Sequence, residues 1–107
     1  MCGETFSEFL VKKRDTVGLS NSRLAALSGM SAVYLGEIVR NKKGPPDKKI
    51  QYALAEALNL TVDEKLKFYD LAARERGEIP IDVYDYLLES PELIEEIRAK
   101  KYGKREL

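Results

Sequence analysis

The first 77 residues contain five segments in which apolar side chains recur at the spacing of an α-helix, each bounded by a capping residue, glycine or proline. Thr5 and Glu8 form a capping box ahead of the first segment, which ends at Gly18. Ser20 opens the second segment, and Ser31 opens the third. No segment alternates apolar and polar residues with the period of two that a half-buried strand requires. The pattern therefore predicts an all-α protein.

The second and third predicted helices are short and follow each other closely. The second is expected to turn Leu24, Ala25 and Leu27 inward and to stop before Gly29. The third ends near Arg40, because the glycine and the two prolines that follow do not permit its continuation.

Four more helices are predicted in the rest of the chain. Apolar side chains repeat at i, i+3, i+4, i+7 and i+8 from Ile50, which indicates a helix that lies flat on a core. Thr61 opens a second capping box, and the fifth helix runs from it toward Gly77. A short sixth helix follows, and Ser90 at the cap with Pro91 at the first helical position predicts a seventh.

Length and charge suggest how these helices are organised. A chain of 107 residues supports one core, so we expect one domain at residues 1–77 and a helical extension at residues 78–107. The net charge is zero, but residues 1–58 carry nine basic and six acidic side chains, whereas residues 59–107 carry nine basic and twelve acidic ones. A basic first half fits a surface that meets phosphate, although two ordinary solvated surfaces fit this distribution as well.

Several classes of function are disfavoured by what the sequence lacks. Cys2 is the only cysteine and there is no histidine, so we expect no internal disulfide, no common zinc site and no histidine-based mechanism. No nucleophile and base occur at a meaningful spacing, so we expect neither enzymatic activity nor a cofactor. Without a long apolar run or a leader-like start, we expect no membrane partner and a cytoplasmic location.

Two short helices joined through Gly29-Met30-Ser31 are typical of a helix-turn-helix, because its tight turn favours glycine and its second helix presents its first turn to DNA. Residues 19–38 (LSNSRLAALSGMSAVYLGEI), followed by RNKKGP, resemble the phage repressor and Cro helix-turn-helix family, and the match covers roughly residues 6–60. The resemblance implies a five-helix, lambda-repressor-like DNA-binding domain, here with a helical C-terminal extension. It also implies that the third helix reads double-stranded DNA, usually as a homodimer on a two-fold symmetric site.

Carried over by position, the resemblance assigns a role to each part of the motif. Phosphate contacts at the start of the second helix fall on Ser20 and Asn21. The base-facing positions of the third helix fall on Ser31, Ala32, Val33, Gly36 and Glu37. Cations in the following loop suit backbone phosphates, and these are Arg40, Lys42 and Lys43.

Side-chain chemistry leaves alternatives open at two of these positions and at a neighbour. Ala32 and Val33 suit a thymine methyl group, and no base-facing residue offers a bidentate contact to guanine, so discrimination is expected to be modest or to depend on DNA shape. Glu37 either accepts a hydrogen bond from cytosine N4 or pairs with Arg40 and touches no base. Tyr34 either stacks on a DNA sugar or packs against the fourth helix.

The extension has a different composition from the first half. Residues 78–97 contain seven acidic and ten apolar side chains and no basic one, which is unsuited to DNA and too apolar for a disordered tail. We expect it to cover the main domain, a second copy of the chain, or another protein. Our hypothesis is that it builds the homodimer, because two recognition helices must lie about 34 Å apart. The basic end at residues 100–105 is expected to add non-specific attraction to phosphate.

The sequence thus predicts a DNA-binding transcriptional regulator, and the family resemblance implies a repressor of a phage, a mobile element or its own operon. The alternative is an antitoxin-like protein that binds a partner protein through its acidic C-terminal helices at residues 78–97.

Overall fold

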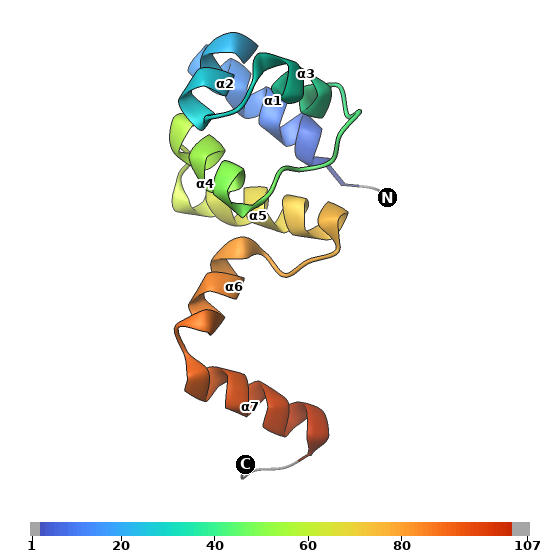
Figure 1. Ribbon diagram of the computed structural model, residues 1–107, viewed down its shortest axis with the longest axis vertical. Coiled ribbons are helices and arrows are strands. Elements are labelled where there is room, and N and C mark those ends of the chain that lie inside the picture. The colour runs from blue at the N-terminus through green and yellow to red at the C-terminus, as the bar shows by residue number, and fades with distance from the viewer. Residues whose placement is uncertain (1–2, 104–107) are drawn as a thin grey trace.

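The computed structural model describes residues 3–103, so Cys2, Lys104 and Arg105 lie outside the described residues. Seven α-helices and no strand occur in this part of the chain, as predicted. The helices are α1 (Phe6–Val17), α2 (Asn21–Ser28), α3 (Ala32–Val39), α4 (Lys48–Ala57), α5 (Val62–Arg76), α6 (Ile81–Leu88) and α7 (Pro91–Tyr102). Helices α1 to α5 form a rounded body, and α6 leads from it to α7, which points away (Figure 1). None of the helices among residues 3–103 is long and apolar enough to cross a bilayer.

The helix starts follow the predicted caps, with one exception. The Thr5 hydroxyl accepts from the backbone N–H of Glu8 at 3.1 Å, and the Glu8 carboxylate accepts from the N–H of Thr5 at 3.0 Å. Thr61 also opens a complete capping box. Ser90 and Pro91 occupy the predicted cap and first helical positions of α7, but the Ser90 side chain accepts no capping hydrogen bond. Its backbone (φ −133°, ψ 73°) lies outside the extended conformation of the five residues whose side chains do cap a helix.

One apolar core joins the first six helices. Phe68 in α5 is fully buried, and its ring centroid lies 4.9 Å from that of Phe6 and 6.2 Å from that of Phe9. Ile81 brings α6 into the same core. The prediction that Leu27 faces inward was wrong, because its side chain is exposed. The buried face of α2 consists of the side chains at i, i+1 and i+4 from residue 24, and residue 27 lies beyond its edge.

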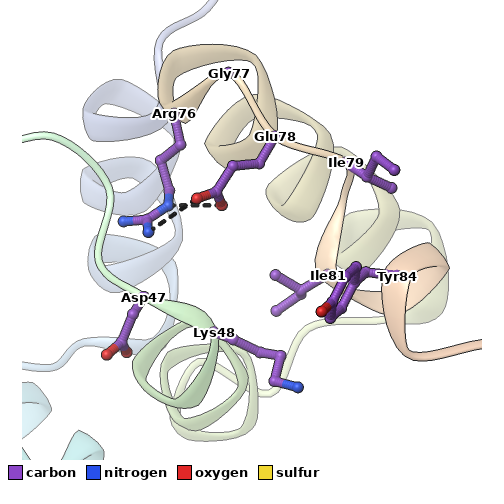
Figure 2. A pocket seen from close by; sticks show the side chains of 8 residues that line it. All are labelled: Asp47, Lys48, Arg76, Gly77, Glu78, Ile79, Ile81 and Tyr84. Carbon is purple, nitrogen blue, oxygen red and sulfur yellow. Dashed lines mark hydrogen bonds and ion pairs between the residues drawn. The ribbon is translucent and has the colours of Figure 1, made fainter. Parts of the chain in front are cut away.

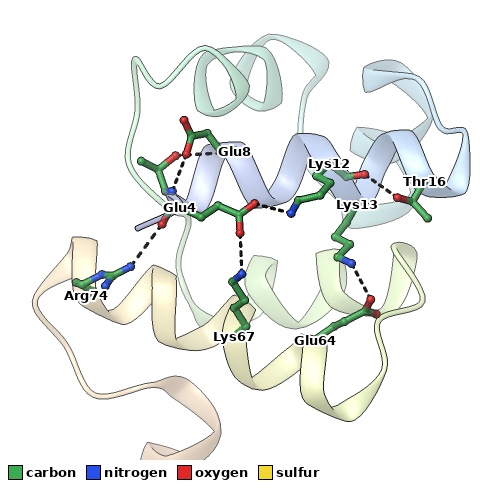
Figure 3. A network of polar contacts seen from close by, with 9 residues as sticks. Glu4, Glu8, Lys12, Lys13, Thr16, Glu64, Lys67 and Arg74 are labelled. Atoms are coloured by element: carbon green, nitrogen blue, oxygen red, sulfur yellow. Dashed lines mark hydrogen bonds and ion pairs between the residues drawn. The ribbon is translucent and has the colours of Figure 1, made fainter. Parts of the chain in front are cut away.

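Polar contacts fasten α1 and the segment before it to α5 (Figure 3). The Glu4 carboxylate lies 2.7 Å from Lys67 and 3.2 Å from Lys12, and the hydrogen bond from Lys67 lowers the pKa of Glu4. Lys13 donates to Glu64 at 2.7 Å. The Ser7 hydroxyl donates to the carbonyl of Val39 at 2.7 Å and so links α1 to α3. The end of α3 is therefore tied to α1, which is itself fastened to α5.

Helix α6 is attached to α4 by a small polar cluster. The Asp85 carboxylate accepts from the Lys48 ammonium at 2.8 Å and from the Tyr52 hydroxyl at 2.6 Å. These two donors hold the pKa of Asp85 below its ordinary value of 3.8. Burial and the hydrogen bond to Asp85 raise the pKa of Tyr52, so the hydroxyl stays a donor.

A cavity of about 630 Å³ lies beside this cluster, where α4, α6 and the end of α5 meet (Figure 2). Ile79, Ile81 and Tyr84 supply most of its apolar lining. Its charged side chains already have protein partners: Arg76 pairs with Glu78, Lys48 pairs with Asp85, and Asp47 caps α4. The cavity therefore presents no charged group that awaits a ligand.

Candidate DNA-binding surface

Helices α2 and α3 are joined by the tight turn that the sequence predicts. Gly29 ends α2 in the left-handed conformation (φ 73°, ψ 31°) and donates its N–H to the carbonyl of Ala25. Met30 donates to the same carbonyl at 3.1 Å. The Ser31 hydroxyl accepts from the backbone N–H of Tyr34 at 3.0 Å and starts α3. Because a side chain strains this backbone conformation, glycine suits residue 29.

Helix α3 has one buried side and one exposed side. Leu35 and Ile38 are buried in the core, and Tyr34 is half-buried and packs against that core, while its contact with the fourth helix stays a prediction. Ser31, Ala32 and Val33 are exposed, and the side chain of Val33 is 72% accessible. One side of α3 is therefore packed in the core, while the side chains of its first turn are exposed to solvent.

The start of α2 carries a contact that sequence reasoning missed. Ser20 is exposed and caps α2 through the N–H of Arg23 at 3.1 Å. Asn21 is half-buried, and its side-chain oxygen accepts from the Arg14 guanidinium at 2.6 Å. Arg14 also pairs with Asp15 at 2.8 Å. This arrangement fixes the Asn21 amide and brings a cation to the start of α2.

In the second turn of α3, the predicted base-facing position at Gly36 is covered by another side chain. Gly36 is buried, and a β-carbon at this position would lie 3.2 Å from the guanidinium of Arg40. The side chain of Arg40 therefore covers the place where residue 36 would present its own. Glu37 forms no ion pair with Arg40 among the described residues, so the structure does not contain the pairing considered for it.

The loop after α3 is organised by the backbone of Glu37. Its carbonyl accepts the N–H of Lys42 at 2.8 Å and that of Lys43 at 3.2 Å, while Asn41 adopts a positive φ of 61°. Arg40, Lys42 and Lys43 are all exposed. The structure thus holds the loop cations close to the end of α3.

Cations near α2 and α3 lack acidic partners, in contrast to those of α1. Lys12, Lys13 and Arg14 each pair with an acidic residue. Within residues 20–50, the cations that form no ion pair with any other described residue are Arg23, Arg40, Lys42, Lys43 and Lys49. A surface whose cations are unpaired suits a polyanion, because no internal ion pair has to break on binding.

The family model for helix-turn-helix proteins of the Cro/C1 type (HTH_3) matches residues 10–65, just over half of the chain. The chain belongs to this family of DNA-binding helix-turn-helix proteins, as the resemblance of its sequence indicated. Its all-helical fold is of the lambda-repressor-like type. Comparisons with curated proteins and with solved structures find no significant match.

Proposed function

We propose that the protein is a transcriptional repressor that binds a two-fold symmetric operator as a homodimer and inserts the first turn of α3 into the major groove. The observation that carries this proposal is the exposed first turn of α3, held by a buried face and followed by unpaired loop cations. Repression requires only that an operator be occupied, which a small DNA-binding chain can do. We propose that the protein acts in the cytoplasm, the compartment that holds its DNA.

Phosphate contacts position the two helices in this proposal. The free backbone N–H groups at the start of α2 bind one phosphate near Ser20 and Asn21, where the hydrogen bond from Arg14 holds the Asn21 side chain in place. On the other side of α3, Lys42 and Lys43 contact phosphates that flank the groove. Together these contacts set the register of α3 on the duplex.

Base contacts come from the exposed side of α3. Ala32 and Val33 meet thymine methyl groups, and Ser31 combines its capping role with a polar contact. Glu37, free of Arg40, accepts a hydrogen bond from cytosine N4. Because Gly36 presents no side chain, the Arg40 guanidinium that covers it occupies this part of the interface.

Selection of bound fragments from a random DNA pool, followed by a salt titration of the best fragment, tests the proposal. A symmetric motif whose affinity falls steeply with salt is the expected result. Val33→Asp should abolish selection of the motif, because it places a carboxylate against DNA. Val62→Asp is the matched control, since Val62 is 70% exposed in the first turn of α5. Recovery of no motif, or equal binding by both variants, would contradict the proposal.

A second candidate function is an antitoxin-like protein that covers a partner with its acidic helices. It is favoured by the exposed apolar side chains of α6, such as Val83, Tyr86 and Leu88, which lie among acidic residues. A stable complex of fixed stoichiometry with a second protein, abolished by Tyr86→Ser and not by Val33→Asp, would support it.

A further inference from the structure

The guanidinium of Arg40 lies beside Gly36, one helical turn before its own α-carbon. A β-carbon at residue 36 would lie 3.2 Å from Nη1, 3.8 Å from Cζ and 3.9 Å from Nη2 of Arg40. Apart from the helix backbone, the three atoms nearest to this position thus all belong to one guanidinium, and Gly36 is buried. The side chain of Arg40 therefore runs back along α3 from the end of the helix toward its first turn.

This direction brings the guanidinium to the middle of the exposed side of α3. Arg40 follows Val33 by seven residues, which is two helical turns, so both project from the same side. That side is opposite to Leu35 and Ile38, which are buried in the core. Because Gly36 precedes Arg40 by four residues, the guanidinium is displaced by about 6 Å along the helix axis toward the first turn.

No group in the described chain competes for this guanidinium. Arg40 forms no ion pair within residues 3–103. The hydrogen bonds that arginine side chains donate in this part of the chain come from Arg14, Arg74 and Arg76. An arginine side chain has five N–H donors in a rigid, planar arrangement. Those of Arg40 are therefore open to a ligand that approaches α3.

The place of the guanidinium favours a base over a phosphate. In a helix that lies in the major groove, the middle of the exposed side meets the base edges, whereas phosphates line the two walls of the groove. Lys42 and Lys43 lie beyond the end of α3, which suits them to one of these walls. Guanine is the base that presents two acceptors side by side in the major groove, O6 and N7, and a planar fork of donors matches them.

We propose that Arg40 is the residue of α3 that recognises guanine, through two hydrogen bonds to O6 and N7. The sequence assigned Arg40 to a backbone phosphate and offered no residue for guanine. Gly36 permits the new role, because a larger side chain would displace the guanidinium from the middle of the helix. The inference rests on the proposed function, since it requires α3 to lie in the major groove, and it adds a guanine to each half of the operator.

Selection from a random DNA pool by the wild type and by Arg40→Ala tests this role. The wild type should select a guanine in each half of its motif, and Arg40→Ala should select the same motif with that position unspecified. Exchanging this G·C pair for A·T should weaken wild-type binding roughly 5- to 150-fold, which corresponds to about 1–3 kcal/mol for a bidentate contact. The same exchange should leave the affinity of Arg40→Ala unchanged.

Lys42→Ala is the matched control, because Lys42 is also exposed and forms no ion pair within residues 3–103. It should weaken binding to all fragments alike and still select the guanine. If Arg40→Ala instead keeps the guanine and weakens all fragments as Lys42→Ala does, Arg40 contacts a phosphate and the inference is overturned.

A modified base tests the contact in the wild-type protein, without any substitution in the chain. 7-Deazaguanine lacks the N7 acceptor and still pairs with cytosine. Placed at the guanine that depends on Arg40, it should weaken wild-type binding and leave the binding of Arg40→Ala unchanged. Equal binding of guanine and 7-deazaguanine by the wild type, at each guanine of the motif, would overturn the inference.

These outcomes separate failure of this inference from failure of the proposed function. A wild type that selects a symmetric motif in which no guanine depends on Arg40 leaves the function standing and shows that the inference is wrong. A wild type that selects no motif contradicts the proposed function, and the role of Arg40 fails with it.

Discussion

The α2–α3 surface and helix α7 both expose apolar side chains, but only the helices of the first also contribute residues to the core. Val33 is more exposed than Ile97, yet the helix that carries Val33 also contributes Leu35 and Ile38 to the core. Helix α7 contributes nothing to the core. The two regions also differ in charge. The charged side chains of residues 40–43, just after α3, are all basic, whereas α7 has an acidic first half and a basic second half.

This difference shows what each region requires of its partner. A surface held from behind keeps its shape before binding, which suits a duplex of fixed geometry. A helix without buried residues gains its own stability from the contact. Exposed apolar side chains alone therefore do not distinguish a DNA-binding surface from a protein interface. The presence or absence of buried residues in the same helix does.

The largest expected effect contrasts the core with the extension. Phe68→Ala removes a fully buried ring that contacts Phe6 and Phe9, and should lower the free energy of unfolding by about 3–5 kcal/mol. Ile97→Ala should change it by less than about 0.5 kcal/mol, because the side chain of Ile97 is 48% exposed. Urea unfolding of both variants provides the measurement. A large loss for Ile97→Ala in the monomer would show that α7 packs on the body.

The next effect contrasts two glycines of the α2–α3 unit. Gly29→Ala places a side chain at a φ of 73° and should cost about 1–2 kcal/mol, although nothing lies within 4 Å of its β-carbon. Gly36→Ala should be neutral or stabilising by up to about 1 kcal/mol, because alanine favours the helix and the Arg40 guanidinium can move. Thermal unfolding provides the measurement. Equal effects at the two positions would contradict this account.

Local signals allowed most of the fold to be predicted from the sequence. The boxes at Thr5 and Thr61, the turn at Gly29 and the prolines after α3 each depend on residues a few positions apart. These signals fixed the helices and the position of the helix-turn-helix. The burial of Leu27 was predicted wrongly because periodicity alone does not locate the edge of a helix face.

Contacts between distant residues could not be predicted. Asp85 meets Lys48 and Tyr52 across more than 30 residues, and no local pattern pairs them. The contact between Arg14 and Asn21 crosses the turn between α1 and α2. At the candidate site, the family resemblance gave the positions, but only the structure shows that Arg40 covers Gly36. The DNA contacts themselves remain predictions.

Salt dependence contrasts the cations of the two regions. If Lys42 contacts a phosphate, Lys42→Ala should reduce the slope of log affinity against log salt by about one and weaken binding roughly eightfold at 0.1 M salt. Lys100→Ala should leave the slope unchanged, because Lys100 lies in α7, at the end of the molecule away from α3 (Figure 1). An equal reduction for Lys100→Ala would instead support the prediction that the basic end attracts phosphate.

The smallest expected effect concerns the attachment of α6, where the two regions meet. Because Lys48 and then Tyr52 donate to its carboxylate, Asp85 has a pKa below 3.8 in the folded protein. The unfolded chain binds this proton more readily, so the stability from Asp85 is complete above its ordinary pKa and is lost as the pH falls through its folded pKa. Asp85→Asn should therefore flatten the acid-induced fall in the urea midpoint between about pH 5 and pH 3.

Asp70→Asn is the control for this measurement, since Asp70 is exposed and forms no ion pair with another described residue. The effect of Asp85→Asn is expected to be modest, because Glu4, Glu64 and Glu78 also have lowered pKa values and remain in the variant. The same dependence on pH in both variants would mean that the Asp85 cluster does not hold α6 to α4. The extension would then be attached through its other contacts, which include the burial of Ile81 and the hydrogen bond from the Tyr52 hydroxyl to the Ile81 carbonyl at 3.3 Å.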